Sequence, residues 1–195
     1  KFYNPIKLDS YGKIYSFSIG SRSIGKSTGW ALRLLSNYLK KGEQFIYVRR
    51  TKDELDETAP SYFDNAINIL LDADYHIDNF NYKGRKYYVN DEVCGYAIPL
   101  SLQRKYKSAD YSKVKYILYD EFMIMPWDTG SYIGGKANML AEVEAMSSLY
   151  QTVDRCRGSA ARNEVKVIFI GNAGTFFNPF FIHFEIDKYL RPDTK

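Results

Sequence analysis

The sequence predicts an α/β domain in which helices flank a central, mostly parallel β-sheet. Two near-continuous apolar runs, residues 114–119 and 165–170, are typical of strands that are covered on both faces of a sheet. Helical patterns separate the strand-like runs, and such alternation along a chain favours parallel pairing. Because 195 residues suit one domain, we expect residues 1–195 to fold as a single unit.

The first part of the chain predicts two strands and two helical segments. Residues 13–19 alternate as a strand, and residues 26–41 carry apolar side chains at helical spacing. Residues 44–48 form the second expected strand. Residues 52–71 favour a helix that is interrupted or restarted at Pro60, because proline has no backbone N–H to donate.

The middle of the chain has a different pattern. Residues 75–100 contain three short β-rich runs separated by turn-forming pairs, which predicts a small antiparallel insertion or meander. A helical stripe follows the apolar run 114–119, and it consists of Met139, Val143, Met146, Tyr150 and Val153. The resulting order of elements agrees with a parallel sheet that has helices on both faces.

Composition narrows the functional classes. The chain has no run of about 18 apolar residues, so we expect no membrane span. Its net charge of +4 permits binding to a polyanion without requiring it. Cys94 and Cys156 are too few for a disulfide framework and lack metal-ligand spacing, so we expect reduced thiols and a cytosolic protein. The 18 Tyr and 12 Phe residues favour packing within the sheet, with stacking on bases as the alternative.

Residues 20–27 fit the phosphate-loop pattern G-x-x-x-x-G-K-[ST] without a mismatch, and they stand between an expected strand and an expected helix. The glycines let backbone amides curve around a phosphate, and the helix adds its positive N-terminal end. Lys26 is expected to reach the β- and γ-phosphates, and the Ser27 hydroxyl to bind Mg²⁺. An ordinary glycine-rich turn is the alternative. We predict that ATP is bound by Gly20, Ser21, Arg22, Ser23, Ile24, Gly25, Lys26, Ser27 and Thr28.

The apolar run 116–119 ends in Asp120 and Glu121, which is a Walker B pattern. Since the carboxyl ends of parallel strands meet at the ligand crevice, we expect Asp120 to bind Mg²⁺. Glu121 is the expected general base that polarises the attacking water. Two solvated turn carboxylates are the alternative. The sequence has no Asn-Lys-x-Asp guanine reader, and a small-molecule kinase needs no water-activating glutamate, so ATP hydrolysis is favoured.

With these motifs, the chain resembles the DNA-packaging ATPases of φ29-like phages, which are additional-strand P-loop motors related to terminases. The matching segments, in order, are residues 2–5, 24–27, 42–50, 97–101, 120–122, 172–173 and 178–179. The run Gly42 to Arg50 is the most specific, because nothing in ATPase chemistry requires it. The resemblance implies a RecA-like fold and ATP hydrolysis that drives double-stranded viral DNA into a prohead.

The resemblance also implies roles for single residues. Asn172 corresponds to a sensor of the γ-phosphate, with a polar strand cap as the alternative. Arg155 corresponds to an arginine finger that reaches the ATP of the neighbouring subunit, and Arg157 competes for that role. Lys107 corresponds to a basic residue near the subunit boundary, and Lys52 to a residue on the DNA-facing side. A helix-terminal arginine and a solvated lysine are the alternatives for Arg155 and Lys52.

The resemblance further implies a homomeric ring, of five subunits, at the portal of an empty capsid in the host cytoplasm. A C-terminal, nuclease-like domain would dock on the portal and on structural RNA, and we expect that domain to be absent from this chain. The chain departs from the family pattern in two places. The segment 123–136 is longer than its counterpart in the family, and residues 159–163 are additional. Two other functions stay open: a ring ATPase in helicase or recombination roles, and a nucleotide-dependent binding switch without significant turnover.

Overall fold

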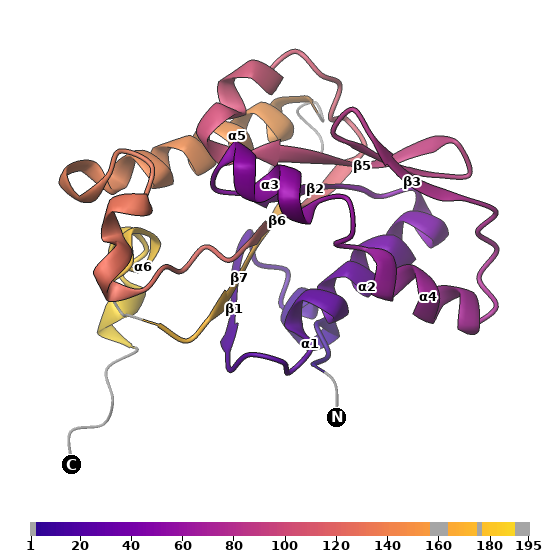
Figure 1. The fold of residues 1–195 in the computed structure, drawn as a ribbon, viewed down its shortest axis with the longest axis horizontal. Helices are drawn as coiled ribbons and strands as arrows, with labels where there is room; N and C mark the ends of the chain where they lie inside the picture. Colours follow the sequence, from indigo (N-terminus) through magenta and orange to yellow (C-terminus); the bar gives the residue numbers. More distant parts are fainter. Residues whose placement is uncertain (1–2, 157–163, 175–176, 190–195) are drawn as a thin grey trace.

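The computed structural model describes residues 3–156, 164–174 and 177–189 (Figure 1). One seven-stranded sheet runs through them in the order β1-β7-β6-β2-β5-β4-β3. The first five strands of that order pair in parallel. They are β1 (Tyr15–Gly20), β7 (Lys166–Asn172), β6 (Val114–Asp120), β2 (Gln44–Arg49) and β5 (Glu92–Pro99). The predicted α/β class with a mostly parallel sheet is therefore confirmed.

The meander expected within residues 75–100 is present, because β3 (Phe80–Lys83), β4 (Lys86–Val89) and β5 pair antiparallel in succession. It is not a separate insertion, however. β5 is also the parallel neighbour of β2, with Gly95 opposite Phe45. A Cβ atom at Gly95 would lie 2.4 Å from the Phe45 ring, so the glycine lets that ring pack flat on β5. The meander thus extends the central sheet.

Alternate side chains of the central strands form two cores, one on each face of the sheet. Leu118 and Ile168 join the first core, whereas their neighbours Ile117 and Val167 join the second. The helices α2 (Lys26–Lys41) and α4 (Asp64–Asp72) cover the first core, and α5 (Leu140–Cys156) covers the second. Figure 1 shows β2, β5 and β6 between α5 and the pair α2–α4.

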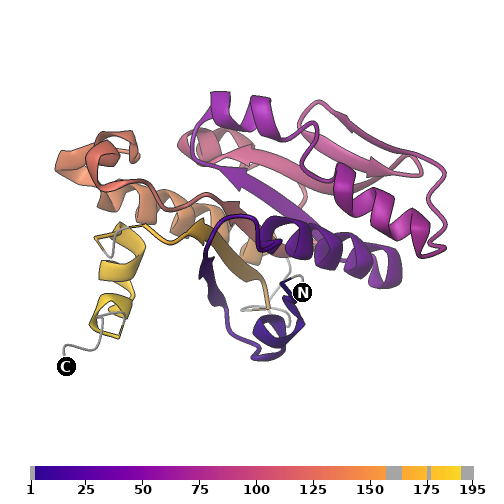
Figure 2. The same cartoon turned by 60° about the horizontal axis from the view of Figure 1, so that its bottom comes forward.

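The helical segments agree with the sequence patterns in their main features. The predicted helix 52–71 is divided near Pro60 into α3 (Lys52–Thr58) and α4. Shorter helices are α1 (Ile6–Ser10) and α6 (Pro179–His183), with 3₁₀ segments at Leu100–Tyr106, Pro126–Ser131, Lys136–Asn138 and Ile186–Lys188. Figure 2 shows α6 at the end of the molecule opposite the β3–β4 hairpin. Among the described residues, no helix is long and apolar enough to cross a membrane.

Parallel pairing brings the functional motifs to one edge of the sheet. Gly20, the last residue of β1, lies opposite Asn172, the last residue of β7. Asp120, the last residue of β6, is paired with Ile170 in β7. Arg49 ends the neighbouring strand β2. The carboxyl ends of these strands therefore form the crevice in which α/β proteins bind ligands.

Candidate functional site

The predicted phosphate loop connects β1 to α2 at this edge. Its backbone curves through left-handed conformations, with φ of +62° at Ser23 and +83° at Gly25. Gly25 is the residue before the first turn of α2, where the absence of a Cβ atom makes this conformation accessible. The loop therefore places the N-terminal end of a 16-residue helix against the crevice.

Lys26 turns back into its own loop. Its Nζ donates hydrogen bonds to the carbonyl oxygens of Gly20 (3.0 Å) and Ser21 (2.7 Å), and it lies 3.4 Å from Asn172 Oδ1. The side chain is buried, and this burial lowers the pKa of Lys26 although the nearby Asp120 carboxylate favours the ammonium. The loop, the lysine and the end of β7 therefore form one connected arrangement.

Ser27 and Asp120 supply the two oxygen donors expected for a metal. Ser27 Oγ lies 3.4 Å from Asp120 Oδ1, to which it donates. The Asp120 side chain is almost completely buried, and this burial raises its pKa to about 6, although Arg49 opposes the shift. A hydroxyl and a carboxylate are hard oxygen ligands, and Mg²⁺ commonly combines one or two of these with water and substrate phosphates. The residues present thus fit a magnesium–nucleotide site.

The raised pKa of Asp120 predicts a pH-dependent effect on stability. Because the folded protein binds the proton more tightly than the unfolded chain, the free energy of unfolding falls as pH rises from about 4 through about 6. Asp120→Asn removes this loss. Without nucleotide and metal, the free energy of unfolding of the variant relative to wild type should increase by roughly 2–3 kcal/mol as the pH rises from about 4 to about 7. Urea denaturation of wild type and Asp120→Asn at both pH values measures this change.

Glu121 differs from Asp120 in its surroundings. Its side chain is 57% exposed, and its backbone is left-handed, with φ +53°. Arg49 Nη2 donates to Glu121 Oε2 at 2.8 Å, while Nη1 of the same guanidinium lies 3.7 Å from Asp120 Oδ2. The expected general base is therefore paired with an arginine and faces the crevice.

Arg49 is a site residue that the sequence patterns did not identify. It follows the apolar run of β2, where it was interpreted only as the end of a strand. The signal was its position, because a charged side chain at the carboxyl end of a central parallel strand faces the ligand crevice. Arg49 is 7% exposed, and its Nε is also within 3.5 Å of Glu54 Oε2 in α3.

Most of the predicted loop and strand-end residues line a common cavity, whereas Gly20 and Ser21 are not in its lining and bind Lys26 through their carbonyl oxygens. Its volume is about 200 Å³, and it is lined by Ser23, Gly25, Lys26, Ser27, Thr28, Asp120, Glu121, Ile170, Gly171 and Asn172. A second cavity shares Glu121 and Asn172 with the first and is also lined by Arg22. Ile24 instead directs its side chain toward Gly20, and its carbonyl oxygen accepts the Tyr3 N–H at 3.0 Å. The loop and the acidic pair, which are 93 residues apart at Ser27 and Asp120, thus converge.

Three of the other predicted residues lie elsewhere in the part of the chain that the structure describes. Arg155 is exposed in the last turn of α5, and Arg157 lies outside the described residues. Lys107 is exposed directly after the 3₁₀ segment that ends at Tyr106. Lys52 is exposed in the first turn of α3, where its Nζ lies 2.7 Å from Asp56 Oδ2. None of these positions tests the role that was predicted for it.

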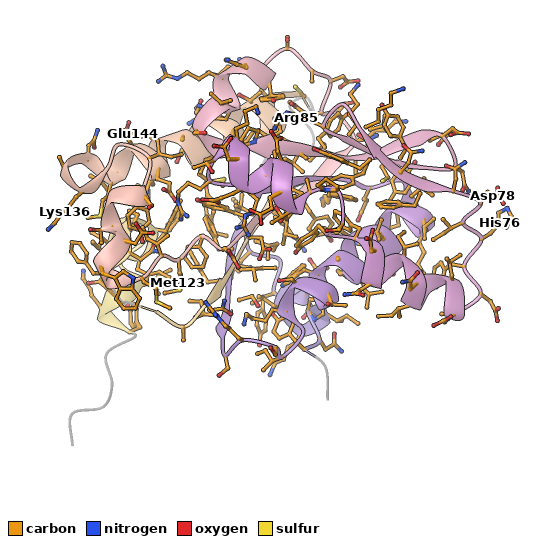
Figure 3. All side chains as sticks on the ribbon, viewed as in Figure 1. His76, Asp78, Arg85, Met123, Lys136 and Glu144 are labelled. Carbon is orange, nitrogen blue, oxygen red and sulfur yellow. The ribbon has the colours of Figure 1, made fainter. Side chains whose placement is uncertain are left out.

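The histidines do not form a metal site. His76 lies 3.4 Å from Asp78 at an exposed edge of the molecule, well away from Met123, which follows the acidic pair (Figure 3). The ring of His183 packs edge-on against Phe184. In the parts of the chain that the structure describes, no group of three or more His, Cys, Asp or Glu side chains could hold a metal ion.

Curated relatives of this chain are DNA packaging proteins of Bacillus phages. The chain is 38% identical over 185 residues to the DNA packaging protein of Bacillus phage phi29, covering 95% of this chain and 50% of that protein. It is 36% identical over 177 residues to the corresponding protein of Bacillus phage B103, covering 91% and 50%. The chain thus spans about half the length of the curated relatives it matches.

Solved structures of phage DNA packaging motors are also similar to this chain. The N-terminal domain of the DNA packaging ATPase from bacteriophage phi29 superposes with a TM-score of 0.79 at 38% identity, covering 98% of this chain and 88% of that one. The phi29 viral genome packaging motor assembly matches with a TM-score of 0.75 at 38% identity, covering 98% and 52%. A Phi-28 gp11 motor, 21% identical over 94% of this chain and 53% of that one, shares the fold with a TM-score of 0.74. Residues 1–192 match the family of the podovirus DNA encapsidation protein (Gp16), and the chain belongs to that family.

Proposed function

We propose that this domain is a RecA-like P-loop ATPase that hydrolyses ATP with Mg²⁺ to move double-stranded viral DNA. The observation that carries the proposal is the convergence of Lys26, Ser27, Asp120, Glu121 and Asn172 on one cavity at the carboxyl edge of the sheet. The Bacillus phage relatives are named DNA packaging proteins, which supports the proposal that hydrolysis drives the movement of DNA.

The phosphate loop and the carboxyl end of β6 would bind ATP and neutralise the charge of its phosphates. Lys26 would exchange its contacts with the Gly20 and Ser21 carbonyls for the β- and γ-phosphates. Ser27 and Asp120 would hold Mg²⁺, which neutralises charge on the transferred phosphoryl group. Asn172 lies beside the Lys26 amine, so its amide is positioned to detect the γ-phosphate. These residues bind and orient ATP without taking a proton.

Glu121 would take the proton of the attacking water. In the present conformation its Oε2 accepts a hydrogen bond from the Arg49 guanidinium, so the carboxylate is engaged by Arg49 and not by a water molecule at the γ-phosphate. Hydrolysis therefore requires Glu121 to leave Arg49 and turn toward the γ-phosphate. We infer that ATP or a neighbouring subunit favours this movement, so that an isolated subunit hydrolyses ATP slowly.

DNA would contact the motor through its phosphates, since a translocase must move any sequence. Lys52, exposed beside Asp56 at the start of α3, is our proposed contact. Phosphate contacts predict binding that weakens steeply with salt and does not depend on sequence. A ring of five subunits at the portal, together with the structural RNA, would carry out packaging in the host cytoplasm.

The proposed function is tested by measuring phosphate release with and without Mg²⁺, and with and without a DNA duplex. Release that requires Mg²⁺ and is stimulated by duplex DNA is the expected result. ATP binding without phosphate release would instead identify a nucleotide-dependent binding switch. Unwinding of a duplex, or equal stimulation by single strands, would favour a helicase or recombination ATPase.

Arg155→Ala is expected to slow hydrolysis about 10³-fold or more in assembled rings, because the lost guanidinium stabilises the transferred phosphoryl group of the neighbouring subunit. Dilute monomers should be unaffected. Mixing Arg155→Ala subunits with Glu121→Gln subunits should restore part of the activity, since some interfaces then combine an intact finger with an intact base. Arg104→Ala, which removes another exposed arginine, is the control. Equal slowing of monomers would contradict a role across the interface.

A further inference from the structure

A buried ionic network lies directly behind the proposed site. Glu142, in the first turn of α5, has no exposed surface. Its carboxylate accepts hydrogen bonds from Arg50 Nε at 3.0 and 3.2 Å, from the Tyr119 hydroxyl and from the Ile133 N–H at 3.0 Å. These donors come from the end of β2, from β6 and from the segment between β6 and α5. One carboxylate thus joins three parts of the chain to α5.

The same arginine also holds the peptide that follows Glu121. Arg50 Nη2 donates to the Phe122 carbonyl oxygen at 2.8 Å, and the Phe122 N–H donates to Ile170 of β7 at 3.2 Å. Residue 122 is therefore fixed at both of its backbone polar groups. Since Arg49 binds the Glu121 carboxylate, two adjacent arginines hold this residue, one by its side chain and one through the next peptide.

The backbone of Glu121 needs such support. Its φ of +53° lies in the left-handed region, which is unfavourable for a residue that carries a Cβ atom. Conformations of this kind persist where the surrounding contacts fix them. The guanidinium of Arg50 is itself fixed between the Tyr119 ring (5.9 Å) and the Tyr132 ring (5.3 Å). It is therefore a rigid anchor for the Phe122 carbonyl.

We propose that Arg50 and Glu142 are positioning residues for Glu121: together they hold the backbone turn after β6 and connect it to α5. The inference rests on the proposed role of Glu121 as the general base. Neither residue lines the nucleotide cavity, so both act through the Phe122 peptide. Met123, Lys136 and Glu144 mark the segment between the acidic pair and α5 in Figure 3. Within this segment, the Ile133 N–H donates to the Glu142 carboxylate.

Fold stability alone does not account for this pair. A buried ion pair loses the solvation of both charges, and well-packed apolar residues of similar volume often stabilise a protein equally well or better. The fully buried position of Glu142 among aromatic and aliphatic residues is one in which an apolar side chain would be expected. What an apolar pair cannot supply is the planar, fixed guanidinium that binds a carboxylate and a carbonyl together.

The decisive experiment compares wild type with the double variant Arg50→Met/Glu142→Leu, which removes both charges and leaves neither unpaired. Its ATP affinity should match wild type, because the phosphate loop is untouched. Its thermal midpoint should fall, because the Tyr119 hydroxyl, the Ile133 N–H and the Phe122 carbonyl lose their partners, so turnover is compared well below both midpoints. Its phosphate release should fall about 10²-fold, since misplacing a reacting group by about 1 Å has an effect of this size. Arg33→Met, which removes a guanidinium bonded to Asp9 on the other face of the sheet, should change neither ATP affinity nor phosphate release.

Arg50→Lys is the second variant, and it keeps a cation beside Glu142. A lysine offers a single point charge in place of the two-sided guanidinium, so it should fold while losing the Phe122 contact. Turnover should fall with unchanged ATP affinity, as in the double variant. Wild-type turnover in either variant would overturn the proposal.

Hydrogen exchange provides a readout that does not depend on catalysis. In both variants the amides of residues 122–133 should exchange faster than in wild type, whereas those of β7 should not. Unchanged exchange would overturn the positioning role even if turnover fell. If wild type itself released no phosphate, the proposed function would fail, and the exchange of these amides would still decide whether Arg50 and Glu142 order the turn.

Discussion

Lys26→Ala is expected to weaken ATP binding by roughly 10²-fold or more. The Lys26 amine is the cation nearest to the loop carbonyls of Gly20 and Ser21, and it lies inside the cavity that also contains Asp120. Charge-assisted hydrogen bonds to two phosphates each contribute about 1.5–3 kcal/mol, so their loss corresponds to a reduction in affinity of roughly 10²-fold or more. Titration calorimetry with ATP and Mg²⁺ measures the loss directly.

The matched control for Lys26→Ala is Lys41→Ala. Lys41 is the last residue of the same helix, and its side chain is 59% exposed. Both variants remove one positive charge from α2, so a general electrostatic effect would weaken binding equally in both. If Lys26→Ala kept a micromolar affinity for ATP, the assignment of the phosphate loop would be wrong.

The order of the strands in the sheet was only partly predictable from sequence patterns. The apolar runs of β6 and β7 predicted buried parallel strands, because both faces of each run must be covered. The antiparallel meander was also predictable from its turns. The pairing of β5 with β2 was not, since periodicity describes which faces of a strand are buried and not which strand lies at its edge. That pairing depends on a contact between Gly95 and Phe45, 50 residues apart in the sequence.

The motif residues of the site were predictable from the sequence, whereas the arginines beside them were not. Motifs identified Lys26, Ser27 and Asp120, because phosphate and metal chemistry restrict the residue types at fixed spacing. Arg49 and Arg50 belong to no such motif. Alternation along β2 implies only that adjacent side chains have different neighbours. The ion pairs with Glu121 and Glu142 depend on the positions of β6 and α5, which three-dimensional packing alone determines.

Glu121→Gln is expected to lower phosphate release by about 10²–10⁴-fold, which is the usual contribution of a general base. Glutamine has nearly the same shape but does not accept a proton at neutral pH. ATP affinity should be retained, because Lys26, Ser27 and Asp120 are unchanged. Single-turnover phosphate release and equilibrium ATP binding, measured on the same preparation, separate these two effects.

Glu54→Gln is the control for this variant, since Glu54 is also an acidic neighbour of Arg49, at 3.5 Å, but does not line the cavity. If the main effect of Glu121→Gln came from disturbing Arg49, the two variants would lose activity to a similar degree. If Glu121 takes the proton from water, only Glu121→Gln should lose turnover at unchanged affinity. If neither wild type nor Glu121→Gln released phosphate above background while both bound ATP, nucleotide binding without turnover would be the function of the site. The difference between the two variants therefore separates a base that acts on water from a carboxylate that only balances the charge of Arg49.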